Sequence, residues 1–208
     1  MTRLVRSKHT LAGGTKGDPV PYPKLVPYFE GHALRFRRGI SGNRLDEDGT
    51  LFIGDGHLSG DWERPDYLGE SNTIHEMAHF VEIDQRRCGM YGWGLKVPEK
   101  FIYNRLVPVP MTHKIADREM RVLAYQFNIL EALGLLSPEL MKLHIEAVVN
   151  FTPDWANIPA SSDQGRIRWA RNQIKKYRKT LTFEKFEVEW WRRSEVLKAR
   201  AKRKPRAA

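Results

Sequence analysis

Residues 75–79 read His-Glu-Met-Ala-His, which places two imidazoles four residues apart and a carboxylate directly after the first of them. In a helix, residues four apart lie on one face a turn apart, so His75 and His79 could hold one metal ion. Glu76 would then stand beside a metal-bound water and act as a general base. The spacing is H-E-x-x-H, in which the two histidines bind Zn²⁺ and the glutamate is the catalytic base. The motif therefore predicts a hydrolytic zinc site.

The motif lies in a stretch that favours a helix. Residues 70–84 contain neither proline nor glycine, and Ser71, Asn72 or Thr73 could cap the start of the helix. The apolar residues follow the helical spacing of a buried stripe: Ile74, Met77, Ala78 and Val81. An alternative for Glu76 is a capping box with Thr73, in which the carboxylate only bonds back to the start of the helix.

A catalytic zinc site usually has three protein ligands and one water, so the two histidines need a third partner. Residues 116–130 form a second helix candidate with an apolar face, and Glu119 lies one turn ahead of that face, on its core-facing side. A carboxylate there is costly unless it is paired or metal-bound, so Glu119 is predicted to be the third ligand. Asp117 is the alternative, and Glu131 is a weaker candidate. Glu119 could also be an ordinary solvated helix charge.

An H-E-x-x-H helix followed by a glutamate on a second helix resembles the gluzincin branch of zinc metallopeptidases. The acidic-then-apolar segment 117–124 is similar in particular to the small bacterial and phage metallopeptidases related to ImmA/IrrE. Met120 and Arg121 depart from the residues of those relatives, which leaves both Asp117 and Glu119 open as the third ligand. The resemblance implies a peptide-bond hydrolase that acts on a protein or peptide substrate.

The rest of the chain predicts a small sheet followed by helices. Residues 33–38 and 50–53 read as two strands that could pair. Together with the resemblance, they predict an α+β, zincin-like fold, with a small antiparallel or mixed sheet packed on the motif helix and a mainly helical C-terminal half. The predicted later helices are 116–133 (ended by Gly134), from Ser137-Pro138 to about 150, 163–179 and 183–202.

The composition predicts three parts. They are an irregular arm rich in Gly and Pro (1–30), a zincin-like domain (31–160) and a basic helical extension with a disordered end (161–208). The single cysteine, Cys88, excludes a disulfide framework and fits a reducing compartment. The chain has no apolar run of membrane-spanning length and no signal-peptide core, so a cytosolic setting is expected, or a virion if the chain is viral.

The net charge of +10 is concentrated at one end of the chain. Residues 166–208 hold 16 Lys and Arg against 4 Glu, whereas residues 1–165 hold 19 basic and 21 acidic residues. Such an extension attracts nucleic acid or another polyanion. The alternative is a solvated helix that only keeps the chain in solution. The rival to a peptidase is therefore a non-catalytic or DNA-recruited protein of zincin fold whose basic tail binds nucleic acid.

Overall fold

The computed structural model of the chain describes residues 20–29, 35–37, 44–45, 50–52, 67–82, 113–151 and 162–203. The helices in these ranges are η1 (Pro23–Leu25, a 3-10 turn), α1 (Val26–Phe29), α3 (Tyr67–Glu82), α5 (His113–Ala132), α6 (Pro138–Phe151), α7 (Asp163–Arg178) and α8 (Phe183–Arg203). The strands are β1 (Arg35–Arg37), β2 (Arg44–Leu45) and β3 (Thr50–Phe52).

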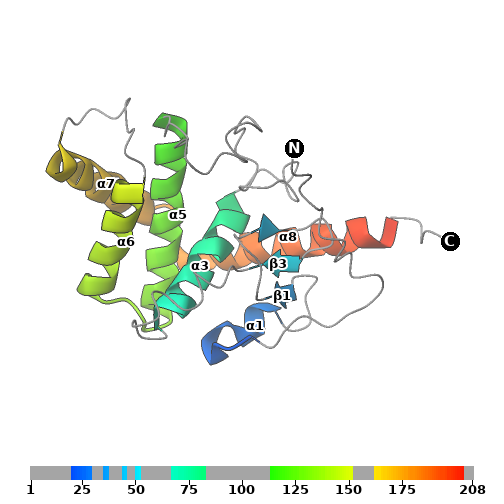
Figure 1. Ribbon diagram of the computed structural model, residues 1–208. Coiled ribbons are helices and arrows are strands. Elements are labelled where there is room, and N and C mark those ends of the chain that lie inside the picture. Colours follow the sequence, from blue (N-terminus) through cyan, green and yellow to red (C-terminus); the bar gives the residue numbers. More distant parts are fainter. Residues whose placement is uncertain are drawn as a thin grey trace, which may run out of the picture.

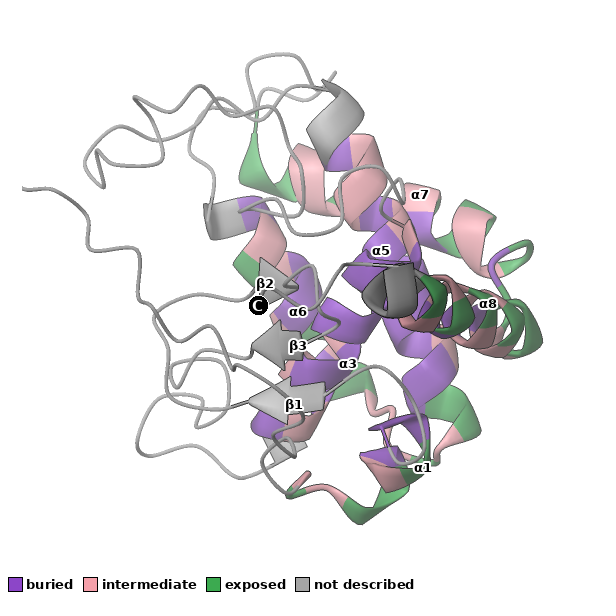
Figure 2. Ribbon diagram, turned by 90° about the vertical axis from the view of Figure 1, so that its right-hand side faces the viewer, coloured by how far each residue is buried: buried purple, intermediate pink, exposed green. Residues whose placement is uncertain are grey.

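The described part of the protein is mainly helical, so the predicted α+β, zincin-like class is wrong. Strand β3 pairs in parallel with β1 and antiparallel with β2, but each strand has only two or three residues. Such strands are too short to form a packing layer, since strands in sheets usually run for about five or six residues. The strands contact mainly one another, and the residues that are described as buried lie on the helices and at Leu181, in the turn between α7 and α8 (Figure 2).

Helix α5 is the centre of this helical assembly (Figure 1). Helices α3 and α7 pack along it, and α6 and α8 also contact it. Its buried residues occupy more than one side of the helix: Ala116, Met120, Val122, Leu123, Ala124, Tyr125, Phe127, Ile129 and Leu130. A helix that is apolar on most sides is expected where other helices surround it. Carboxylate and amide side chains on α5 therefore lie close to the core.

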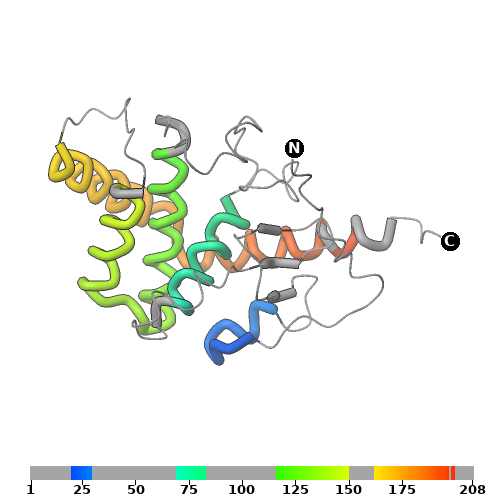
Figure 3. Tube along the Cα trace, viewed as in Figure 1, coloured from blue at the N-terminus to red at the C-terminus, as the bar shows by residue number. Residues whose placement is uncertain are grey.

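Aromatic side chains join the N-terminal segment to α8 and α3. Trp190 is fully buried and donates its indole N–H to the backbone carbonyl of Tyr28 at 3.0 Å. The rings of Phe80 and Phe186 lie 5.2 and 5.7 Å from the ring of Trp190 between centroids. Large rings bury much apolar area, so the segment 23–29 (blue in Figure 3) is part of the core.

The predicted ends of the later helices are confirmed, except that α5 begins at His113, three residues before the predicted start. Gly134 follows α5 with φ 66°, and the N–H of Leu135 reaches back to the carbonyl of Leu130 at 2.7 Å, as in a glycine-terminated helix. Ser137 caps α6, because its Oγ accepts from the N–H of Leu140 at 3.1 Å. Helices α7 and α8 agree with the predicted ranges to about one residue.

No helix in the described ranges is both long and apolar enough to cross a membrane, as the sequence predicted. The predicted domain boundaries near residues 30 and 160 fall outside the described residues and stay predictions, as does the disordered end.

Candidate metal centre

Helix α3 carries the motif and begins earlier than the sequence suggested. It starts at Tyr67, so Thr73 lies inside the helix and donates its hydroxyl to the carbonyl of Gly69 at 2.9 Å. Thr73 therefore does not cap the helix, and the capping-box alternative for Glu76 is wrong. The apolar stripe beside the motif is buried, which fixes the rotation of α3 about its axis: Ile74, Met77, Ala78 and Val81.

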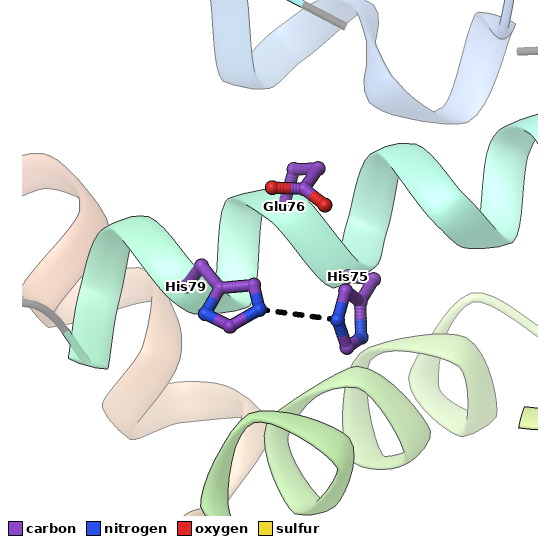
Figure 4. A group of neighbouring side chains, drawn as sticks. All are labelled: His75, Glu76 and His79. Carbon is purple, nitrogen blue, oxygen red and sulfur yellow. Dashed lines mark hydrogen bonds between the residues drawn. The ribbon is translucent and has the colours of Figure 1, made fainter. Parts of the chain in front are cut away.

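His75 and His79 project from α3 toward α5 (Figure 4). Their Nε2 atoms lie 3.1 Å apart, and their ring planes are nearly perpendicular, at 85°. Two ligand atoms of a tetrahedral zinc ion with bonds of about 2.0–2.1 Å would lie about 3.4 Å apart. The two imidazoles are thus close to the spacing that one zinc ion requires.

Glu119 of α5 brings a third possible donor atom to the imidazole pair. Its Oε2 lies 3.8 Å from Nε2 of His75 and 3.5 Å from Nε2 of His79. The three atoms form a triangle whose centre is about 2.0 Å from each corner, close to the length of zinc bonds to nitrogen and oxygen. The side chains that were predicted as metal ligands are therefore brought together by two facing helices.

The protonation state of Glu119 depends on the groups that surround its side chain. The side chain is only 13% exposed, and burial raises its pKa from about 4.5 to about 7, although Arg118 acts in the opposite direction. A buried carboxylate is costly without a compensating positive charge. A cation held by the two imidazoles would supply that charge, and two nitrogens with one carboxylate oxygen are a donor set that zinc prefers.

The other candidate ligands on α5 are engaged elsewhere. The carboxylate of Asp117 accepts a hydrogen bond from the hydroxyl of Tyr177 on α7. Glu131 is exposed at the far end of α5 and pairs with Arg178 at 2.5 Å. Of the three carboxylates considered on α5, Glu119 is the one that lies beside the imidazoles.

Glu76, the third residue drawn in Figure 4, is only 4% exposed. One of its carboxylate oxygens and one nitrogen of each imidazole all lie within 4.8 Å of one another. Because Glu76 directly follows His75, it is turned about 100° from it around the helix. Figure 4 shows its carboxylate on the other side of the α3 ribbon from the two imidazole rings. Glu119 alone closes the triangle from the opposite helix.

Gln126 of α5 determines which nitrogen of His75 carries the proton. Its amide Nε2 donates to the backbone carbonyl of Ser71 at 3.0 Å, and a carbonyl can only accept, so the orientation of the amide is defined. Its Oε1 then faces Nδ1 of His75 at 3.0 Å and accepts from it. With the proton on Nδ1, Nε2 presents its lone pair toward Glu119, which is the tautomer that a metal ligand needs.

His144 of α6 completes this buried network. Its Nε2 lies 2.6 Å from the hydroxyl of Ser71 and 3.1 Å from the amide nitrogen of Gln126. Burial lowers the pKa of His144 to about 3, and the nearby imidazole of His75 adds to that effect. The ring is therefore neutral at pH 7, and the one lone pair of its Nε2 can accept from one of these two donors, of which the hydroxyl of Ser71 is the nearer. Sequence analysis missed this network; the available signal was a polar Gln126 among the apolar residues of α5.

An ion pair joins the motif helix to α5 one turn beyond His79. Arg121 donates to Glu82 from Nε at 2.9 Å and from Nη2 at 3.1 Å, so the two groups meet at two points. Two-point contacts between guanidinium and carboxylate define orientation as well as distance. The pair thus helps to hold α3 and α5 at the separation that brings Glu119 to the imidazoles.

Comparison with known proteins found no match, whether against protein-family models, curated proteins or solved structures. The resemblance to gluzincins therefore rests on the motif of α3 and the carboxylate of α5 alone.

Proposed function

We propose that this protein is a zinc-dependent metallopeptidase. The observation that supports it is the triangle formed by Nε2 of His75, Nε2 of His79 and Oε2 of Glu119, with sides from 3.1 to 3.8 Å. Two imidazoles and one carboxylate form a three-ligand set of the kind that catalytic zinc sites use when the fourth position is left to water. A structural zinc ion would take a fourth protein ligand instead.

Each motif residue then has a role in peptide hydrolysis. Bound zinc would lower the pKa of a water toward neutrality and polarise the substrate carbonyl. Glu76, in its ionised form, accepts a proton from the attacking water as oxygen bonds to the carbonyl carbon. Glu76 then gives that proton to the leaving nitrogen as the C–N bond breaks. Gln126 keeps the proton of His75 on Nδ1, away from the reacting groups.

The replacement Glu76→Gln tests this role, because the amide keeps the shape of the side chain but cannot take up the proton. We expect zinc to remain bound while the rate of peptide cleavage falls by roughly 10²–10⁴-fold. The measurements are metal analysis of the purified protein and mass spectrometry of a peptide library. Glu195→Gln, at an exposed position of α8, is the matched control and should cleave normally. Cleavage at the wild-type rate by the Glu76 variant would refute the proposal.

A second candidate is a non-catalytic metal-binding protein that its C-terminal extension attaches to nucleic acid. The charge of residues 166–208, with 16 basic and 4 acidic side chains, favours it. Bound zinc without any cleavage by the wild-type protein would select this candidate. We place either activity in the cytosol, because a chain with one cysteine suits a reducing compartment.

A further inference from the structure

The outer side of α7, together with its C-cap residue Lys179, carries four cations in a line. They are spaced three or four residues apart and all are exposed: Arg168, Arg171, Lys175 and Lys179. At about 100° and 1.5 Å per residue, they lie within about 80° of one another and extend over about 16 Å of the helix axis. These four residues are called the α7 basic face below.

The other side of α7 fixes this orientation. Ala170 and Ile174 are buried, and Tyr177 donates its hydroxyl to Asp117 of α5. A helix held by one side must present the opposite side to solvent. The α7 basic face is therefore directed outward by packing and is not free to turn toward the core.

None of the four residues of the α7 basic face forms an ion pair with a carboxylate in the described part of the chain, although Glu131 of α5, which pairs with Arg178, lines the same surface groove as three of them. Two cations of α8 differ, because glutamates on the same helix neutralise them. Arg192 pairs with Glu189 at 2.5 Å, and Lys198 pairs with Glu195 at 2.6 Å.

A groove runs beside the α7 basic face, between α7 and the start of α6. Its apolar floor is formed by Leu136, Met141 and Ile174, and three residues of the basic face line it: Arg171, Lys175 and Lys179. Among the described residues, no aromatic side chain lines it. Proteins that bind single strands usually stack bases on aromatic side chains, so this lining favours contact with a sugar–phosphate backbone over contact with unstacked bases.

We propose that the α7 basic face binds the phosphate backbone of a nucleic-acid duplex without reading its sequence. A DNA duplex carries about one charge per 1.7 Å of its axis, so about ten phosphates lie along the 16 Å of the basic face. Contacts to phosphate give affinity and position but carry no base information. None of these four residues is part of the candidate metal centre, so binding by this surface does not depend on the proposed catalysis.

The test measures binding of the full chain to a fluorescent DNA duplex of about 20 base pairs and mixed sequence, between about 50 and 300 mM salt. The quadruple variant R168A/R171A/K175A/K179A is expected to bind at least hundredfold more weakly near 0.1 M salt. The slope of log K against log [salt] should become shallower by up to about 3.6, at about 0.9 per lost phosphate contact. The double variant K175A/K179A should lose about half of that slope.

The matched control removes the same charge elsewhere. In K142A/K185A/R192A/K198A the four cations come from α6 and α8, and three of them have acidic partners: Glu146, Glu189 and Glu195. The salt slope of this variant should change by less than about one. All substituted positions of the basic face are exposed, so the unfolding midpoints and zinc content of the basic-face variants should match those of the wild type.

Three results would overturn the proposal. Equal losses in the two quadruple variants would assign binding to net charge and not to α7. Tighter binding to a single-stranded oligonucleotide of the same length would contradict the proposal that the surface binds a duplex. Tighter binding to vesicles rich in phosphatidylserine would assign the surface to a membrane. Absence of peptidase activity would overturn the proposed function but would leave each of these measurements unaffected.

Discussion

The metal centre between α3 and α5 and the α7 basic face use charge in opposite ways. At the metal centre, His79 and Glu119 are largely buried and converge on one point from two helices. On α7, four exposed cations project outward from one helix without partners in the described residues. The first arrangement is held by hydrogen bonds behind His75, whereas the second is held only by the packing of the helix that carries it.

This difference indicates what kind of ligand each region can bind. A buried donor is costly until a ligand of the right charge arrives, so the metal centre should discriminate sharply and lose much when one atom is removed. Exposed charges cost little, act over about a Debye length and are screened by salt. Each residue of the α7 basic face should therefore contribute a small and nearly equal part of the binding free energy. The predictions below test this contrast, from the largest expected effect to the smallest.

Glu119→Gln should weaken zinc binding by about 100-fold or more, because even the residues behind metal ligands change affinity by about 10–100-fold. Zinc affinity is measured by competition with a chelating dye. Asp117→Asn is the control two residues away, and it should keep its zinc because Asp117 bonds to Tyr177. The reverse outcome, with zinc lost only in the Asp117 variant, would reassign the third ligand.

Gln126→Leu should weaken zinc binding by roughly 10–100-fold, because His75 loses the acceptor that keeps its proton on Nδ1. Gln126→Glu keeps an acceptor for Nδ1 and should retain more affinity than the leucine variant. Asn128→Leu is the control: this amide of α5 bonds to backbone carbonyls near the end of α7, so its loss should leave zinc bound. Unchanged zinc affinity in Gln126→Leu would show that the glutamine does not position the imidazole.

His144→Gln should remove an acid-sensitive part of the stability. The pKa of His144 is about 3 in the folded chain and near 6.5 when unfolded, because burial penalises the imidazolium ion. Below pH 6.5 only the unfolded chain takes up this proton, so the stability is complete above pH 6.5 and is lost as the pH falls toward 3. At pH 5 the loss is about 2 kcal/mol.

The glutamine in that variant can still accept from Ser71 but does not titrate. Urea unfolding at pH 7.5 and pH 5.0, with chelator present for both proteins, gives the difference between them. Other titrating groups, including Glu119, largely cancel in this difference. A variant that loses as much stability on acidification as the wild type would show that His144 is already protonated or solvated in the folded chain.

Lys175→Ala and Arg171→Ala should each change the free energy of unfolding by less than about 0.5 kcal/mol, since neither residue has an acidic partner in the described residues. Urea unfolding at low salt checks both. A loss above about 1 kcal/mol would mean that the α7 basic face has a structural role, and the contrast with the metal centre would then be weaker.

Local signals in the sequence predicted much of the helical structure. Gly134 after an apolar helix and Ser137 before Pro138 specify helix ends through backbone chemistry that needs no distant partner. The spacing of His75 and His79 likewise predicts that they share one helix face. Glu119 was predicted to be the third ligand because a carboxylate on the core-facing side of a helix is costly unless it is paired or metal-bound.

The remaining features depend on contacts between distant parts of the chain. The network of Ser71, Gln126 and His144 joins three helices, and no periodicity marks those positions as partners. The start of α3 was placed too late because Thr73 resembles a cap, whereas its hydroxyl bonds within the helix. The α+β class was wrong because short alternating segments were taken as a layer, while the core is built from helices.

One consequence follows from the division of the donor atoms between two helices. A cation shared by His79 and Glu119 closes a loop of roughly 40 intervening residues, and the entropy of loop closure grows only with the logarithm of loop length. Doubling that length would cost about 0.6 kcal/mol. The spacing of the donor atoms is set by the packing of α3 on α5, so the number of residues between the helices should change the entropy of closure without changing that spacing.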